Sequence, residues 1–329
     1  MAVVFHGGRL DAAIAKYGGN REDWLDLSTG INPNSYPVSE ISSEAWNRLP
    51  DRKAEEKLLC AAQGYYEVPA GFEVVAAPGT QAIIQLLPRL LQAKTVEIIS
   101  PTYWEHAEVW NRADSDVLST TEIDDLSGKA DAVVVVNPNN PDCRIHDPET
   151  LARLSDKTRL LVVDEAFADT MPDKSIVTCL PENVVVLKSF GKFFGLAGLR
   201  LGFAICEPNL ADRLRSALGP WAVSGAALEI GSAALADQQW INKTRGELEE
   251  SSQKLASVVT AKGLDVRGRN PLFLDVYHSK ATSLLEYLSR SHILVRPFPD
   301  RAGYLRFGIC KDANELRRLE SALEAYGDI

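Results

Sequence analysis

A serine, a lysine and an arginine lie close together between residues 184 and 203 of this chain. The apolar run 184–187 is typical of a buried strand, and Ser189, Lys192 and Arg200 follow it in a segment rich in glycine. A lysine just past a buried strand can lose hydration, which makes its amine a better nucleophile. A hydroxyl and a guanidinium on either side of it suit a phosphate group. This combination predicts pyridoxal phosphate (PLP) bound to Lys192 as a Schiff base, and the alternative is a surface loop with a solvated lysine.

Two other apolar runs end in polar residues of specific types. The run 132–136 leads into an Asn-Pro-Asn-Asn-Pro turn, and the run 160–163 leads into Asp164. A carboxylate at the edge of an apolar run needs a partner, and the protonated pyridine nitrogen of PLP would be one. Asn140 would donate a hydrogen bond to the ring oxygen. Each residue also has a structural alternative, a turn for Asn-Pro and a helix N-cap for Asp164. Their order at successive strand ends favours the cofactor.

Two further segments fit a phosphate-bearing aromatic ligand. The Gly79-Thr80 turn leads from a strand into a helix, where backbone N–H groups favour phosphate. Tyr103 follows another strand and would stack on a flat ring. The alternatives are an ordinary strand–helix turn and an aromatic side chain packed in the core.

Alternation of apolar runs with helical patterns predicts an α/β fold with a mostly parallel sheet between helices, and a ligand site at the carboxyl ends of its strands. The expected strands are 73–77, 96–99, 132–136, 160–163, 184–187 and 202–205, with helices at 53–64, 81–91, 106–112 and 149–154. Later helical text covers 208–218, 226–261, 284–289 and 314–326, with strands near 266, 273–276 and 305–309. We expect an N-terminal arm (1–40) with a short helix near 11–17, a large PLP-binding domain (41–225), and a linking helix with a smaller α+β domain (226–329).

Composition bounds the class of protein. The 329 residues are 45% hydrophobic and 24% charged, as in ordinary globular proteins. The net charge is −10 and the sequence has no stripe of basic residues, so we expect no nucleic-acid partner. No apolar run predicts a membrane helix, and the N-terminus lacks a signal-peptide pattern. Five scattered cysteines fit a cytoplasmic protein without a disulfide framework or metal site. Surface or capping roles are expected for His106, His146, His278 and His292.

Three motifs together resemble the fold-type-I PLP enzymes of the class I/II aminotransferase superfamily, over nearly the whole chain. They are Asn137-Pro-Asn-Asn-Pro141, Val163-Asp-Glu-Ala-Phe167 and Ser189-Phe-Gly-Lys-Phe-Phe-Gly-Leu-Ala-Gly-Leu-Arg-Leu-Gly202. The resemblance implies that Lys192 is the Schiff-base lysine and Asp164 the partner of the pyridine nitrogen. The other implied cofactor contacts are Asn140 at the ring oxygen, Tyr103 on the ring, and Ser189, Arg200, Gly79 and Thr80 at the phosphate.

The arm resembles one branch of this superfamily, the threonine-phosphate decarboxylases of cobalamin biosynthesis. The segments that carry this are His6-Gly-Gly8 and Leu25-Asp-Leu-Ser-Thr-Gly-Ile-Asn-Pro33, together with Phe167, where the related histidinol-phosphate aminotransferases usually have Tyr. Implied substrate contacts are His6, Gly7, Gly30, Asn140, Arg296 and Arg306. The chain departs from its relatives after Asn140, where Pro-Asp-Cys replaces the usual Thr-Gly ending, and at Leu49, where a Tyr often reaches the partner subunit's cofactor.

The resemblance implies a homodimer that decarboxylates L-threonine O-3-phosphate to (R)-1-amino-2-propanol O-phosphate. Lys192, Asp164 and the two arginines are equally compatible with an aminotransferase for a phosphorylated amino acid or amino alcohol such as histidinol phosphate. A third interpretation, from a different class, is a non-catalytic ligand-binding or assembly protein that retains the fold.

Overall fold

The computed structural model describes residues 7–327, so the predicted substrate contact His6 lies outside the described residues. The chain forms two compact units. One comprises residues 35–140 and 144–241 and is called the sheet unit here. The other, the arginine unit, combines residues up to 34 with 141–143 and 242 onwards. The N-terminal arm therefore belongs to the same unit as the C-terminal strands.

The sheet unit is built on a seven-stranded sheet with the order β2-β8-β7-β6-β5-β3-β4. The strands are β2 (Glu73–Ala77), β3 (Thr95–Ile99), β4 (Asp116–Thr120), β5 (Ala132–Val136), β6 (Leu161–Asp164), β7 (Val184–Ser189) and β8 (Gly202–Cys206). Strand β8 runs antiparallel to both neighbours, and the other neighbouring pairs are parallel. Every residue of β5 and β6 is buried, because helices cover both faces of a mostly parallel sheet. The predicted fold class is confirmed.

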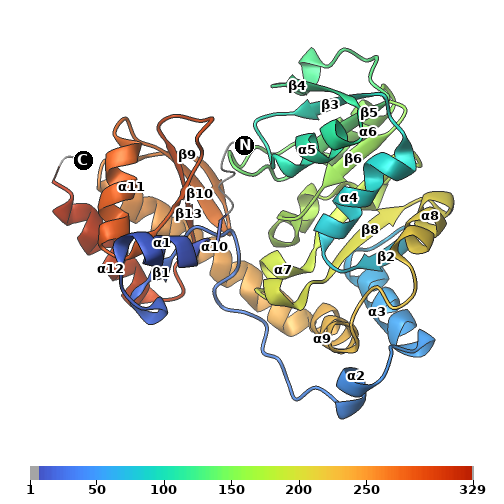
Figure 1. The fold of residues 1–329 in the computed structure, drawn as a ribbon, viewed down its shortest axis with the longest axis horizontal. Helices are drawn as coiled ribbons and strands as arrows, with labels where there is room; N and C mark the ends of the chain where they lie inside the picture. The colour runs from blue at the N-terminus through green and yellow to red at the C-terminus, as the bar shows by residue number, and fades with distance from the viewer. Residues whose placement is uncertain (1–6, 328–329) are drawn as a thin grey trace. The chain divides into compact units, whose positions relative to one another are not determined.

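The sheet unit also contains helices before, between and after its strands (Figure 1). They are α2 (Ser43–Asn47), α3 (Arg52–Tyr65), α4 (Thr80–Leu91), α5 (Glu105–Arg112), α6 (Pro148–Ser155), α7 (Phe190–Phe193), α8 (Pro208–Leu218) and α9 (Gly225–Ala236). Leucine, isoleucine and valine side chains of α4, α5 and α8 share one core with β3, β5 and β8. The side chain of Asp51 caps α3 by accepting a hydrogen bond from the Ala54 N–H group (2.8 Å).

The structure differs from the sequence prediction in several elements. The short elements α2, α7, β1 (Leu25–Asp26), β11 (Ile293–Leu294) and β12 (Arg296–Pro297) were not predicted, and two larger differences have a clear physical reason. Strand β4 was not predicted, because an edge strand with mostly exposed residues lacks an apolar run. The helical stretch predicted over 226–261 is divided into α9 and α10 (Gln238–Ala261). The break lies at Asp237, whose side chain accepts a hydrogen bond from the Trp240 N–H group (3.0 Å) and so favours a new helix start.

The arginine unit contains a four-stranded antiparallel sheet with the order β12-β13-β10-β9. Its strands are β9 (Asp265–Asn270), β10 (Phe273–Tyr277), β12 (Arg296–Pro297) and β13 (Tyr304–Gly308), and its helices include α1 (Leu10–Tyr17), α11 (Ala281–Arg290) and α12 (Ala313–Ala325). The arm strand β1 (Leu25–Asp26) pairs in parallel with β11 (Ile293–Leu294). Leu25 and Leu27 enter the same apolar core as Leu305 and Phe307, which fixes the arm to this unit.

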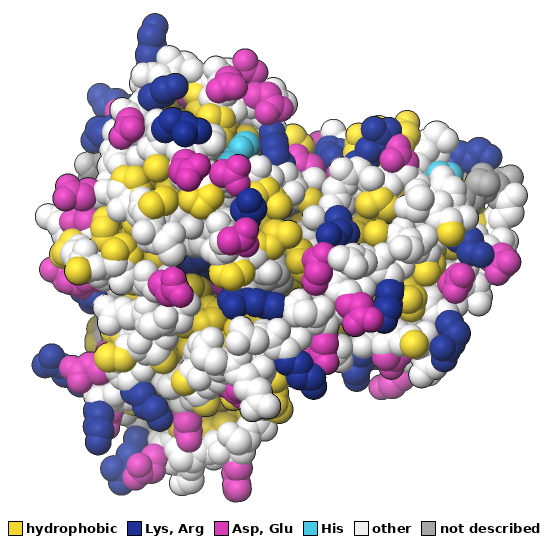
Figure 2. All heavy atoms as spheres, turned by 180° about the vertical axis from the view of Figure 1, so that it is seen from behind, with side chains coloured by type: hydrophobic (Ala, Val, Ile, Leu, Met, Phe, Trp, Pro, Cys, Tyr) yellow, Lys and Arg dark blue, Asp and Glu magenta, His cyan; other side chains and the backbone are white. Residues whose placement is uncertain are grey.

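Surface composition is mixed in sign. On the face shown in Figure 2, lysine and arginine side chains are interspersed with aspartate and glutamate side chains. Among the described residues, no helix is both long enough and apolar enough to cross a membrane.

A buried ion pair joins Lys188 on β7 to Glu165, the residue that directly follows β6. Lys188 Nζ lies 2.5 Å from Glu165 Oε2 and donates to Ser175 Oγ at 3.0 Å. Glu165 also accepts a hydrogen bond from the Ile176 N–H group (2.8 Å), and the ammonium group lies 5.0 Å from the centre of the Tyr66 ring. Burial raises the pKa of the Tyr66 phenol, so this side chain stays neutral beside the ion pair.

We expect Lys188→Met to lower the free energy of unfolding by about 3 kcal/mol, because it leaves the Glu165 carboxylate buried without its cation. Urea unfolding measures this loss. Lys243→Met, which removes an exposed lysine paired with Glu247, is the control and should change stability by less than about 0.5 kcal/mol. Adding Glu165→Gln to Lys188→Met should recover part of the loss; a Lys188→Met protein as stable as wild type would contradict a structural role for the pair.

Candidate active site

Three polar segments meet at one edge of the large sheet. Strand β6 pairs with β5 and β7, so that Asp164 lies opposite Val136 on one side and Leu187 on the other. All three strands are parallel, and their carboxyl ends lead into the segments with Asn140, Asp164 and Lys192. Ligand sites of open α/β sheets form at this edge.

Asp164 is a buried carboxylate with a histidine partner. Its Oδ2 atom lies 2.9 Å from Nε2 of His106, and its Oδ1 atom accepts the Ala166 N–H group at 3.0 Å. The two residues are 4% and 1% exposed. The expected surface or capping role was therefore wrong for His106. One available signal was its spacing from Tyr103, since a separation of three residues at a helix start brings two side chains to the same side.

The rings of Tyr103 and His106 meet edge to face, with centres 6.0 Å apart. The Tyr103 hydroxyl donates to Gln81 Oε1 (3.2 Å), and Gln81 Nε2 donates to the buried Glu105 (2.9 Å). This network joins the first turns of α4 and α5. It fixes the position of the Tyr103 ring beside the Asp164–His106 pair.

In the Asn-Pro-Asn-Asn turn, Asn137 and Asn139 make structural hydrogen bonds, and Asn140 is the predicted cofactor contact. Asn137 donates to the carbonyl oxygens of His146 (3.1 Å) and Lys174 (3.2 Å). Asn139 donates to the carbonyl of Pro101 (2.8 Å) and accepts from the Thr102 hydroxyl (2.7 Å). These two residues hold the turn in place. Asn140, the predicted ring contact, is buried at its end.

A second group of residues forms a cradle with the donors that a phosphate requires. Gly79, with φ of +83°, precedes the first residue of α4, Thr80. A Cβ atom on Gly79 would lie 2.7 Å from Arg200 Nη2, and one on Gly202 would lie 2.5 Å from the Thr80 nitrogen. Ser189 is the ladder partner of Gly202. Because Gly79 and Gly202 have no side chains, the first turn of α4 can lie close to the Arg200 guanidinium and to the end of β7 that carries Ser189.

Lys192 lies on α7, directly after β7. Its Nζ atom is 5.5 Å from the centre of the Phe167 ring, in the segment that follows Asp164. The short helix is anchored by aromatic packing, because Phe190 stacks on Phe194 with ring centres 4.4 Å apart and Phe194 stacks on Trp240 at 5.6 Å. This packing supports the helix that carries Lys192.

The donor set of the sheet unit fits PLP. A buried carboxylate suits the protonated pyridine nitrogen, and the turn at the start of α4 with Arg200 suits the phosphate. Lys192 supplies the amine for a Schiff base. The glycine cradle at residues 79 and 202 is the observation that supports this fit, since any side chain there would close the space beside the donors.

The arginine unit contains the second group of predicted residues. Arg306 is buried, donates from Nη2 to the Ser28 carbonyl (2.8 Å), and has its guanidinium 4.9 Å from the centre of the Phe273 ring. Arg296 is its ladder partner on β12. Burial, reinforced by Arg296, lowers the pKa of Arg306 well below its usual value, so a bound anion would be strongly favoured there.

The N-terminal arm packs closely around Arg306. A Cβ atom on Gly7 would lie 2.5 Å from the Ser28 carbonyl oxygen and 3.6 Å from Arg306 Nη2. The Gly8 N–H group donates to Ser28 Oγ (2.8 Å), and that hydroxyl donates to Asp26 (2.6 Å). Gly30, which follows Ser28 by two residues, is also buried. The predicted arm contacts Gly7 and Gly30 and the predicted Arg296 and Arg306 thus belong to one unit.

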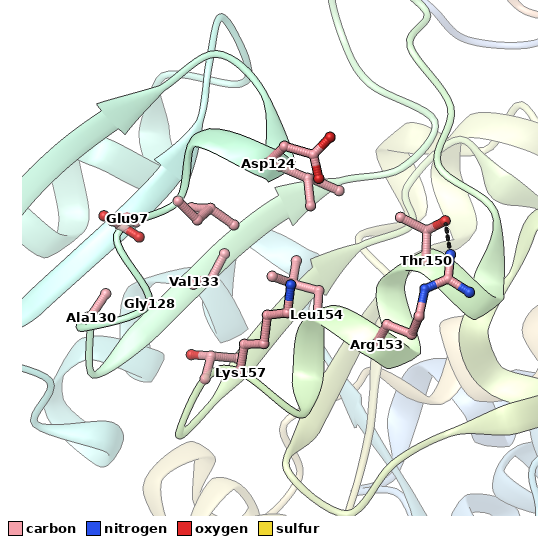
Figure 3. A pocket seen from close by; sticks show the side chains of 12 residues that line it. Glu97, Asp124, Gly128, Ala130, Val133, Thr150, Arg153, Leu154 and Lys157 are labelled. Carbon is pink, nitrogen blue, oxygen red and sulfur yellow. Dashed lines mark hydrogen bonds between the residues drawn. The ribbon is translucent and has the colours of Figure 1, made fainter.

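The sheet unit also has a cavity that lies away from the candidate active site (Figure 3). It has a volume of about 220 Å³ and is lined by residues that include Glu97, Ala130, Arg153 and Thr158. Ala130 and Thr158 precede β5 and β6, so this cavity lies toward the amino ends of those strands. It is separate from the edge that carries Asp164 and Lys192.

The fold and the donor set define a PLP-dependent enzyme of the aminotransferase type. The sequence matches the aminotransferase class I and II family over residues 22–323, and the chain belongs to this family. It is 43% identical to a threonine-phosphate decarboxylase from a Sinorhizobium species, over 98% of each chain. It is 39% identical to the threonine-phosphate decarboxylase of Pseudomonas aeruginosa, over 98% of this chain and 97% of the relative.

A solved structure shares the fold. Histidinol-phosphate aminotransferase from Sinorhizobium meliloti, in complex with pyridoxal-5'-phosphate, superposes with a TM-score of 0.81 over 99% of this chain and 96% of its own, at 17% identity. The predicted family membership and cofactor class are confirmed.

We expect His106→Leu to weaken PLP binding about tenfold, because Asp164 loses the partner that orients its carboxylate toward the pyridine nitrogen. The dissociation constant is measured by titrating protein freed of cofactor with PLP. His106→Gln keeps a hydrogen-bond donor and should remain within about threefold of wild type. Equal affinity in the leucine variant and wild type would show that His106 does not support the cofactor.

Proposed function

We propose that this protein is a PLP-dependent decarboxylase that converts L-threonine O-3-phosphate to (R)-1-amino-2-propanol O-phosphate and CO2 in cobalamin biosynthesis. The observation that carries the proposal is identity of 43% and 39% to threonine-phosphate decarboxylases over nearly the full chain. The arginine unit supports it, because two guanidinium groups on neighbouring strands suit a substrate with both a phosphate and a carboxylate.

The sheet unit prepares the site for the cofactor. When bound, PLP supplies an electron sink for the pair of electrons left by the departing CO2. Asp164 would hold the proton on the pyridine nitrogen, with His106 fixing the carboxylate. Gly79, Thr80, Ser189 and Arg200 would bind the phosphate of the cofactor. Lys192 would hold the cofactor through its amine and would supply the proton that replaces the carboxylate.

The arginine unit would select the bond that breaks. Arg296, together with the arm backbone at Gly7 and Gly30, is proposed to bind the phosphate of the substrate, and Arg306 to lie at its carboxylate or share the phosphate. Asn140 is proposed to contact both ring and substrate. Binding energy from a remote phosphate can orient the carboxylate for loss, so that decarboxylation is favoured over proton removal from the same carbon.

A decarboxylation assay tests this proposal. Wild type should release CO2 from L-threonine O-3-phosphate without a 2-oxo acid acceptor, and Lys192→Ala should lose both this activity and the visible absorption of lysine-bound PLP. Formation of glutamate from 2-oxoglutarate and histidinol phosphate, without CO2 release, would instead support an aminotransferase. A wild-type protein that develops no cofactor absorption when supplied with PLP would support a non-catalytic protein.

We propose a homodimer whose interface includes exposed apolar side chains of the sheet unit. Trp46, Leu49 and Trp221 are 65%, 66% and 58% exposed. Pro50, next to Leu49, and Trp221 line one cavity of about 470 Å³. Large exposed aromatic side chains around a hollow are typical of protein interfaces rather than of solvated surface. The net charge of −10, with basic and acidic side chains interspersed on the face that Figure 2 shows, supports a small-molecule substrate rather than nucleic acid.

We expect light scattering to give wild type about twice the 36.1 kDa chain mass. Trp221→Glu should shift the protein toward the monomer, because a carboxylate would be buried without a partner. Leu118→Glu changes an exposed apolar residue on the edge strand β4 and serves as the control, with no expected change in mass. A Trp221→Glu dimer as stable as wild type would exclude this surface.

The five cysteines support a reducing compartment, and we propose the cytoplasm. All five are free thiols in the structure. Burial raises the pKa of Cys206 and Cys310 to about 12, so these thiols stay protonated and unreactive.

A further inference from the structure

Charged side chains form a row across the sheet of the arginine unit. Asp275 on β10 is the ladder partner of Arg306 on β13, and Arg306 is the partner of Arg296 on β12. Directly opposite residues of antiparallel strands project from the same face of a sheet. The row continues to Gly268 on β9, where a Cβ atom would lie 2.3 Å from the Asp142 carbonyl oxygen. This face is therefore closely covered by chain.

The simplest expectation for this row is an ion pair between Asp275 and Arg306. Opposite charges in directly paired positions attract, and an arginine with a carboxylate favours a bidentate pair. Such a pair would place a carboxylate of the protein on the guanidinium that is proposed to bind an anionic group of the substrate.

The structure instead pairs Asp275 with a third arginine from the loop before β13. Arg301 Nη1 donates to Asp275 Oδ1 and Nη2 donates to Oδ2, each at 3.0 Å. The guanidinium of Arg301 also lies 4.0 Å from the centre of the Tyr304 ring. Asp275 is 1% exposed, so its charge depends on this pairing. Meanwhile Arg306 Nη2 is directed to the Ser28 carbonyl.

We propose that Arg301 is a positioning residue that occupies both oxygens of Asp275, so that this carboxylate does not compete with an anionic group of the substrate for Arg306. The inference rests on the proposed function, in which Arg306 binds substrate. It assigns Arg301 a role in substrate affinity that is separate from any contribution to folding. Removing Arg301 would leave the buried carboxylate of Asp275 opposite its ladder partner Arg306, where it would compete with the substrate.

The test compares four variants of the PLP-loaded enzyme. Arg301→Met should raise KM for L-threonine O-3-phosphate about tenfold or more, with a smaller change in kcat, because ground-state binding is lost. The double variant Asp275→Asn/Arg301→Met removes the competing carboxylate and should return KM to within about threefold of Asp275→Asn alone. Arg290→Met, which removes an exposed arginine paired with Glu286, is the control and should leave KM unchanged.

A double variant as impaired as Arg301→Met, or an unchanged KM in Arg301→Met, would overturn the proposal and assign Arg301 a structural role only. If Arg301→Met fails to fold by thermal unfolding, Arg301→Lys decides: one ammonium leaves Asp275 partly unpaired, so KM should rise more than about threefold and recover when Asp275→Asn is added. If wild type releases no CO2, calorimetric binding of L-threonine O-3-phosphate to the same variants tests the inference independently of the reaction.

Discussion

The pairing of β6 between β5 and β7 is the constraint on which the sheet unit depends. It places Asp164 opposite Val136 and Leu187, at the carboxyl ends of three parallel strands. Parallel ladders fix the ends of neighbouring strands at one edge, so the segments with Asn140 and Lys192 must begin beside Asp164. A shift of this register by one residue would reverse the faces of every side chain in β6.

Two adjacent carboxylates, Asp164 and Glu165, are buried at the end of β6. Asp164 and Glu165 are both less than 5% exposed, and each needs a compensating partner. Asp164 meets His106, and Glu165 meets Lys188 and Ser175. The Asp164–His106 pair belongs to the proposed cofactor site, whereas Glu165 with Lys188 and Ser175 stabilises the fold. The cofactor residues can therefore be polar without weakening the connection between the strands.

Sequence patterns were most informative where local chemistry determines structure. The strands at 73–77 and 132–136 and the helix at 208–218 have the predicted bounds, because apolar runs and helix periodicity mark them. The motifs around Asp164 and Lys192 lie at the predicted strand ends. His106 and Arg301 could not be found in the same way, because their importance comes from partners 58 and 26 residues away in sequence. Such tertiary pairs leave no periodic signal, and the polar edge strand β4 leaves none either.

The arginine unit is assembled from the two ends of the chain, and this affects how the protein can be made. The hydrogen bond between Arg306 and the Ser28 carbonyl joins residues 278 positions apart. During synthesis from the N-terminus, the arm emerges before the sheet unit, whereas its partners β11 and β13 emerge after it. Residues 35–140 and 144–241, which make up the sheet unit, can fold in the interval. The arm therefore cannot pair with β11 and β13 until these strands have emerged from the ribosome, so the anion site forms only after the residues of the sheet unit have been synthesised.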